Sequence, residues 1–244
     1  MLNTIFGGEK KPPLPFKVRK GVLNHIAFAM KGAIVWSKVN NVPIKDAYEK
    51  KLAVVNDLLE IQVKKNIPIF TFLALGEKLN PDNLQIIVDS LADFFNTLAE
   101  DDFIHKNQIK VAVIGKWYDL PDRLVEAVKN VIDKTRDYEH FFVNFCIYYN
   151  GQQEIVDACK LLGRQLIAGK IDVDSINRDV IKENLYSSYY PPPNILINNM
   201  NRKTSGLLLW DSMYSRIFYL DKLWPDVTKA DILKIIDDYF GQKH

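Results

Sequence analysis

The stretch HIAFAMKGAIVWSK, at residues 25–38, predicts a buried strand, then a tight turn, then a helix. In α/β proteins, a turn between a strand and a helix is a common position for phosphate chemistry. Here the turn carries Lys31 and Gly32, and three apolar residues follow at 33–35. The loop is either an active-site loop of unusual composition or one that has lost its chemistry.

The same alternation continues along the chain. Short apolar runs rich in β-branched and aromatic residues predict strands, and apolar residues at helical spacing predict helices. The strand-like runs lie at 67–75, 109–115, 141–149 and 191–199, and a further buried run lies at 207–220. The helical patterns lie at 45–66, 80–107, 120–137, 151–170, 172–185 and 228–241. We therefore predict a single α/β domain, with a central, mostly parallel sheet of about six strands surrounded by helices.

Composition limits the class of protein. The chain has 244 residues and a net charge of +2, which does not predict nucleic-acid binding. No apolar run reaches the roughly 18 residues of a membrane span. We predict a partly mobile leader at 1–24, a domain at 25–244, and a cytoplasmic protein with at most peripheral membrane contact. Cys146 and Cys159 lack metal or redox spacing and are predicted to be buried thiols.

Four motifs resemble the cis-prenyltransferases, the family of undecaprenyl and dehydrodolichyl diphosphate synthases. They are HIAFAMKG at 25–32, IKVAVIGKWYDLP at 109–121, NFCIYYNGQQEIVDACKLL at 144–162 and LLLWDSMYSRIFYLDKLWPDV at 207–227. The resemblance implies the family's fold, with a hydrophobic tunnel for a growing isoprenoid chain. It also implies a dimer, to whose contact the last motif belongs. The interface residues expected on this ground are Leu208, Trp210, Tyr214 and Trp224.

The same comparison shows departures at the family's catalytic positions. Active members carry an Mg²⁺-binding aspartate in the turn after the first strand, an arginine that starts the diphosphate clamp, and a second acidic residue in the last motif. At these three positions this chain has Lys31, Asn198 and Arg216. The three residues after the turn glycine also depart from the family and are Ala33, Ile34 and Val35. An ammonium cannot ligate a hard cation that needs anionic oxygens. The resemblance therefore implies no metal site and no catalytic residue in this chain.

On these grounds we expect a non-catalytic subunit of a heteromeric cis-prenyltransferase, similar to the Nogo-B receptor type, which makes long-chain polyprenyl diphosphate for a glycosyl-carrier lipid such as dolichol. The catalytic homologue would hold Mg²⁺, and this chain would bind no cofactor. The Arg-x-Gly tail of active homodimers has no clear counterpart before the end of the chain. Two alternatives stay open: a prenyl transferase that is active on its own, or a homodimeric scaffold that binds isoprenoids or diphosphates.

A metal-free anion site is a second hypothesis for the basic residues. The residues that could form it are Lys31, Gly32, Arg202, Lys203 and Arg216. The alternative is that the charged side chains are solvated or paired at the surface. His25 is predicted to be structural and Glu77 to be a surface residue.

Overall fold

The computed structural model describes residues 21–200 and 205–241, so most of the predicted leader lies outside the described residues. One six-stranded sheet forms the centre, in the order β3-β4-β2-β1-β5-β6, and every strand pairing in it is parallel. The strands are β1 (His25–Ala29), β2 (Ile69–Leu73), β3 (Ile109–Ile114), β4 (Phe141–Cys146), β5 (Ile195–Asn199) and β6 (Arg216–Leu220). The predicted α/β class with a sheet of about six strands is confirmed.

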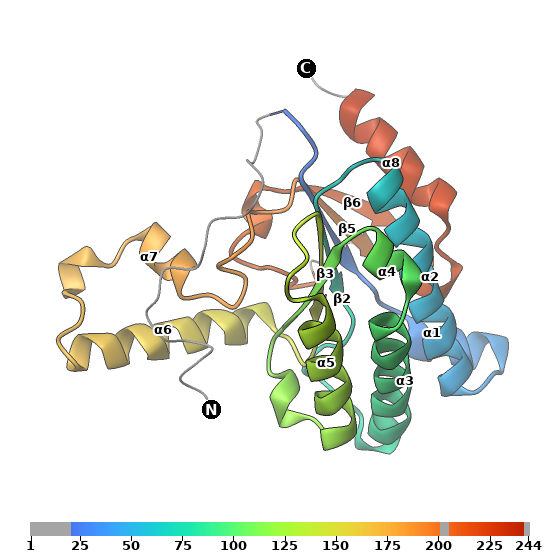
Figure 1. The fold of residues 1–244 in the computed structure, drawn as a ribbon, viewed down its shortest axis with the longest axis horizontal. Coiled ribbons are helices and arrows are strands. Elements are labelled where there is room, and N and C mark those ends of the chain that lie inside the picture. Colours follow the sequence, from blue (N-terminus) through green and yellow to red (C-terminus); the bar gives the residue numbers. More distant parts are fainter. Residues whose placement is uncertain (1–20, 201–204, 242–244) are drawn as a thin grey trace.

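α-Helices form the crossovers between β1 and β5, whereas turns and a 3₁₀ helix lead from β5 to β6. The α-helices are α1 (Ala33–Asn40), α2 (Ile44–Lys64), α3 (Pro81–Ala99), α4 (Asp102–Lys106), α5 (Asp122–Thr135), α6 (Gly151–Ile167), α7 (Arg178–Glu183) and α8 (Lys229–Gly241). Figure 1 shows α6 and α7 projecting to one side of the sheet, away from α1, α2 and α8. No helix in the described ranges is long and apolar enough to cross a membrane.

The larger hydrophobic core lies between one face of the sheet and helices α2, α3 and α5. Its centre is aromatic: the Phe28 and Phe72 rings stack at 4.8 Å between centroids, and Phe145 lies 5.7 Å beyond Phe72. Phe94 and Phe95 reach Phe145 from α3. Side chains alternate between the two faces of a strand, so Ala27 of β1 and Leu196 of β5 point to a smaller core on the opposite face.

Three predicted elements differ from the structure. The pattern at 80–107 divides into α3 and α4, because Asp101 leaves the helix and its side chain caps α4 by accepting a hydrogen bond from Phe103 N. The predicted helix at 172–185 divides into a 3₁₀ helix at Val173–Ser175 and the short α7, which Asn177 caps. The apolar run at 207–220 is turn and 3₁₀ helix until β6 begins at Arg216. Cys146 is buried as predicted, but Cys159 is exposed because it faces outward from α6.

Candidate functional site

A pocket of about 690 Å³ opens at the carboxyl ends of β1 and β2. Ligands of open parallel sheets bind at this edge. Two continuous segments supply much of its lining: residues 30–35, which follow β1, and residues 73–80, which follow β2. The remaining described lining residues come from α2, α3, the start of α6, the end of β5 and the segment 205–209: Tyr48, Lys51, Ile87, Tyr149, Asn150, Gln152, Met200, Ser205, Gly206 and Leu209.

The turn after β1 is held in a fixed position by Asn199, the last residue of β5. The Lys31 backbone N donates to Asn199 Oδ1 at 3.0 Å, and Asn199 Nδ2 donates back to Lys31 O at 2.7 Å. Gly32 has φ of +103°, and a Cβ there would lie 2.6 Å from Met200 Sδ. The turn therefore requires glycine at position 32. The pair of asparagines that ends β5 was the sequence signal for this clamp, and the sequence analysis did not use it.

Lysines dominate the charged groups of the pocket. Among the described lining residues, the charged types are Lys31, Lys51 and Lys78 and one carboxylate, Glu77, so lysines outnumber carboxylates. Glu77 accepts a hydrogen bond from Asn150 Nδ2 at 2.9 Å and is half-buried rather than the surface residue predicted. Burial lowers the pKa of Lys31 below its ordinary value. The pocket therefore favours an anionic ligand.

Helix starts add to this preference. The first turn of α1 lines the pocket, and its N-cap, Gly32, offers no side chain to the backbone N–H groups. These N–H groups have no partner within the helix, and the helix dipole places partial positive charge there. The N-cap residues of α3 and α6, Asn80 and Asn150, also line the pocket, but their side chains already accept hydrogen bonds from the first N–H groups of those helices.

Lys51 is the residue in this site that the sequence analysis missed. It is 4% exposed, and its Nζ donates to Ala74 O at 2.6 Å. Burial lowers the pKa of its ammonium to about 7. A signal was present, because Lys51 follows Tyr48 by three residues and precedes Val55 by four, which places it on the buried face of α2.

Trp224 joins the two elements that carry Lys31 and Lys51. Its backbone N donates to Lys31 O at 3.0 Å, and its indole Nε1 donates to Lys51 O at 3.0 Å. Trp224 is fully buried and Leu208 is 2% exposed, so neither presents a surface to a second chain in this fold. Of the four expected interface residues, Trp210 is half-buried and Tyr214 is 63% exposed, so these two keep that expectation open.

Arg216 does not join Lys31 in one pocket of this chain, contrary to the hypothesis above. Arg216 lies in register with Ile195, and Ile195 with Ile26, at the amino end of the sheet. Lys31 follows the carboxyl end of β1, five residues beyond Ile26, or about 16 Å along a strand. The Arg216 guanidinium instead lies 5.0 Å from the ring of Phe218.

The remaining predicted residues have these positions. Arg202 and Lys203 lie outside the described residues. Asn198 is fully buried, does not line the pocket, and its side-chain N and O have no hydrogen-bond partner among the described residues. Its side chain faces the opposite side of the sheet from Asn199. Ala33, Ile34 and Val35 do line the pocket and give one wall an apolar surface.

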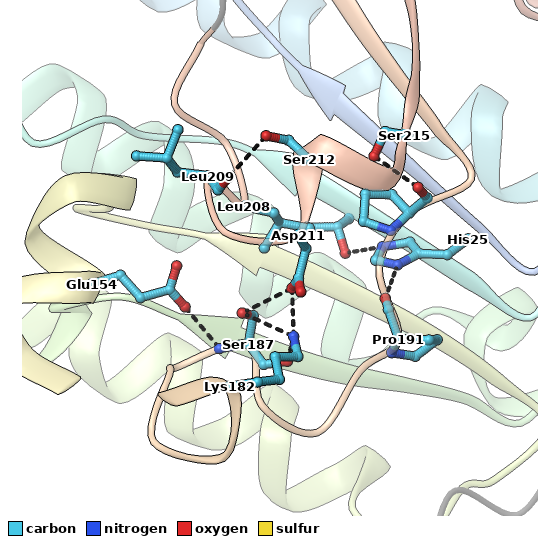
Figure 2. A network of polar contacts seen from close by, with 12 residues as sticks. His25, Glu154, Lys182, Ser187, Pro191, Leu208, Leu209, Asp211, Ser212 and Ser215 are labelled. Atoms are coloured by element: carbon cyan, nitrogen blue, oxygen red, sulfur yellow. Dashed lines mark hydrogen bonds and ion pairs between the residues drawn. The ribbon is translucent and has the colours of Figure 1, made fainter. Parts of the chain in front are cut away.

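A buried polar network joins Glu154 of α6 to Ser187, which follows α7, and to Asp211, which precedes β6 (Figure 2). The carboxylate of Glu154 accepts from Ser187 N at 2.9 Å, and Lys182 forms an ion pair with Asp211. Ser187 Oγ donates to Asp211 at 3.3 Å, which links the two groups. Burial raises the pKa of both carboxyl groups. Tyr149, a lining residue, donates to Glu154 at 2.5 Å, so the network reaches the pocket.

His25 lies below the pocket in β1 and is fully buried. Its Nδ1 lies 2.8 Å from Pro191 O, which can only accept, so Nδ1 carries the proton and Nε2 accepts from Thr71 Oγ1 at 2.8 Å. Burial lowers its pKa to about 4. Both ring nitrogens are thus used within the fold, in agreement with the predicted structural role.

The lining residues do not fit a resident Mg²⁺. Magnesium is held by one or two carboxylates together with water and substrate phosphates. Glu77 is already bonded to Asn150, and lysines occupy the other charged lining positions. Within the described ranges no three His, Cys, Asp or Glu side chains are grouped so that they could hold a metal ion.

The sequence of this chain is similar to known proteins of one family. A family model described as "Putative undecaprenyl diphosphate synthase" matches residues 29–244. A tritrans,polycis-undecaprenyl-diphosphate synthase (geranylgeranyl-diphosphate specific) of Thermoplasma volcanium is 31% identical over 88% of this chain and 85% of its own. The protein of the same name from Picrophilus torridus is 34% identical over 80% and 76%.

Solved structures share the fold at lower identity. Lavandulyl diphosphate synthase from Lavandula x intermedia, in complex with dimethylallyl diphosphate, is similar with a TM-score of 0.84, 20% identity, and 91% and 96% of the two chains covered. A "probable undecaprenyl diphosphate synthase" from Campylobacter jejuni has a TM-score of 0.73, 22% identity, and 92% and 98% covered. The chain therefore belongs to the cis-prenyltransferase family, which includes the undecaprenyl diphosphate synthases.

Proposed function

We propose that this chain binds an isoprenoid diphosphate in the pocket at the carboxyl edge of the sheet and acts in polyprenyl diphosphate synthesis. The observation that carries the proposal is the pocket's division into a cationic and an apolar part. Lys31, Lys51 and the first turn of α1 offer positive charge, while Leu75 and Ile87 offer apolar surface. An amphiphilic anion matches both parts.

The relatives' names suggest the first ligand to test. Several relatives are named as synthases specific for geranylgeranyl diphosphate. In such a ligand the diphosphate would contact the lysines, and the isoprenoid tail would follow the apolar residues between α2 and α3. The aromatic group of Phe28, Phe72 and Phe145 lies in the core behind this region and is not part of the lining.

Prenyl transfer breaks the bond between the allylic carbon and the diphosphate, so negative charge develops on the leaving group. Lys31 and Lys51 are placed to neutralise that charge without a metal held by this chain. On this basis we propose an atypical prenyl transferase as the leading candidate. The relatives named as synthases support a chain that acts on the substrate itself.

A second candidate is a non-catalytic subunit that supports an aspartate-bearing homologue. Two observations favour it. Lys31 occupies the turn where active members hold Mg²⁺, and Glu77 is the single carboxylate among the described lining residues. In this case Mg²⁺ belongs to the catalytic partner. The exposed Tyr214 and the edge strand β6 are the first surfaces to examine for the contact.

One assay separates the two candidates. The purified chain is supplied with geranylgeranyl and isopentenyl diphosphates, with and without Mg²⁺, alone and after co-expression with an aspartate-bearing homologue. Elongation by the chain alone supports the first candidate. Elongation that this chain enhances only in complex with the homologue supports the second. No elongation in any arm would contradict both candidates.

A further inference from the structure

The side-chain amine of Lys51 is buried, and no anion is paired with it among the described residues. Lys51 is 4% exposed, and its positive charge loses the solvation of water without an ion pair to replace it. Buried lysines in proteins are normally paired, because desolvation of an unpaired ammonium is expensive. The residue therefore calls for an explanation other than stability.

The contacts of the Lys51 ammonium place it on the pocket wall. Its one described hydrogen bond runs to Ala74 O at 2.6 Å, and the ring centre of Tyr48 lies 4.9 Å from Nζ. Both of these residues, like Lys51 itself, line the pocket. An ammonium has three N–H donors, so the bond to Ala74 leaves donor capacity for a ligand.

The backbone of Lys51 is held rigidly. Its carbonyl accepts the indole N–H of the fully buried Trp224 at 3.0 Å, and the same tryptophan holds the Lys31 carbonyl from its backbone N. A lysine that served only to cap the Ala74 carbonyl would be an expensive choice, because a neutral donor could satisfy a carbonyl without a buried charge. A fixed, unpaired lysine amine on a pocket wall is instead suited to an anion that arrives with the ligand.

We propose that Lys51 binds the phosphate oxygens of the ligand directly and takes up a proton as the ligand enters. The part of this inference that concerns isoprenoid diphosphates rests on the proposed function. The anion contact itself applies to any diphosphate that fits the pocket. The ligand's negative charge stabilises the ammonium form, so binding and protonation favour each other.

Other titratable or charged groups also line the pocket and are compared with Lys51. The lining groups that titrate or carry charge are Lys31, Tyr48, Glu77, Lys78 and Tyr149. Burial raises the pKa of Tyr48 to about 12 and that of Tyr149 well above its ordinary value, so neither titrates near neutrality. Lys31 has a lowered pKa but is less buried than Lys51, so it serves as the comparison.

The test is isothermal titration calorimetry in the presence of a chelator, with inorganic pyrophosphate and with geranylgeranyl diphosphate as separate probes. Buffers of different ionisation enthalpy report the protons taken up. The variants are Lys51→Met, Lys51→Arg, Lys31→Met and, as a control on the same helix, Lys45→Met. Lys45 lies in an exposed ion pair with Glu49 away from the pocket.

For the wild type at about pH 8 we expect uptake of close to one proton with either probe. We expect Lys51→Met to bind both probes at least tenfold more weakly and to lose this proton uptake. Lys51→Arg keeps the charge at every accessible pH, so it should bind with reduced proton uptake. Lys31→Met should weaken binding but retain the uptake, and Lys45→Met should match the wild type. Circular dichroism confirms that each variant is folded.

The outcomes separate the two proposals. Lys51→Met that binds both probes like the wild type, with the same proton uptake, would overturn this inference and leave the proposed function intact. Lys51-dependent binding of pyrophosphate, with geranylgeranyl diphosphate bound no more tightly, would support the anion contact and contradict the isoprenoid function. A wild type that binds neither probe would overturn both.

Discussion

Replacing Lys51 by methionine should stabilise the unliganded protein, and the gain should depend on pH. Burial lowers the pKa of Lys51 from 10.5 to about 7 in the folded chain. Each pKa unit corresponds to about 1.4 kcal/mol, so the folded state loses on the order of 5 kcal/mol where the ammonium is present in both states. Methionine has a similar length and no charge to desolvate.

The direction of the pH dependence follows from the number of protons that the folded and unfolded states bind. Between about pH 7 and pH 10.5 the unfolded chain holds a proton on Lys51 that the folded chain lacks, so wild-type stability rises with pH through this interval. Below about pH 7 both states are protonated and the full penalty remains. The advantage of Lys51→Met should therefore be largest below about pH 7. It should shrink by about 1.4 kcal/mol for each pH unit above that.

Urea unfolding at a series of pH values from about 6 to 9.5 measures this difference, and groups common to both proteins cancel in it. Over that range the advantage of Lys51→Met should fall by about 3 kcal/mol. Lys45→Met is the control and should follow the wild-type curve within about 0.5 kcal/mol. Parallel curves for the wild type and Lys51→Met would contradict this prediction, because they would show that the Lys51 ammonium keeps its solvation in the folded protein.

Three other variants or groups test the parts of the fold that support the pocket. Lys182→Met leaves Asp211 buried without its ion-pair partner and should lower the free energy of urea unfolding by about 3 kcal/mol; no recovery in the double variant with Asp211→Leu would contradict this account. Trp224→Phe removes the indole bond to Lys51 and should cost about 2 kcal/mol in the same assay, whereas a change below about 0.5 kcal/mol would show that the bond is dispensable. His25 should remain a neutral imidazole with the proton on Nδ1 in ¹⁵N NMR spectra at about pH 5; an imidazolium signal from the folded protein would disprove the buried hydrogen-bonding scheme.

The sheet could be predicted because each strand is a short apolar run between turn residues, and both faces of a parallel sheet are covered. The turn at Lys31 and Gly32 was found for the same reason, since it follows such a run. The segment at 207–220 shows the limit. Its apolar residues bury a turn as well as a strand, and periodicity alone does not distinguish the two.

The predicted position of Arg216 was wrong because the start of this strand was not predicted. Because the strand starts at Arg216 itself, that side chain lies at the amino end of the sheet, where sequence order gave no warning. Lys51 was missed for a different reason. A lysine is usually exposed, so its position on the apolar face of α2 was not read as a burial signal. The clamp between Asn199 and Lys31 joins residues 168 apart in sequence, which local patterns do not reveal.

The cationic pocket can be tested by equilibrium binding of geranylgeranyl diphosphate to the purified wild-type chain, with a chelator present throughout. A pocket whose charge comes from Lys31, Lys51 and helix α1 should bind the ligand saturably at one site per chain, without added metal. Binding that appears only when Mg²⁺ is supplied, or no binding at all, would contradict the account.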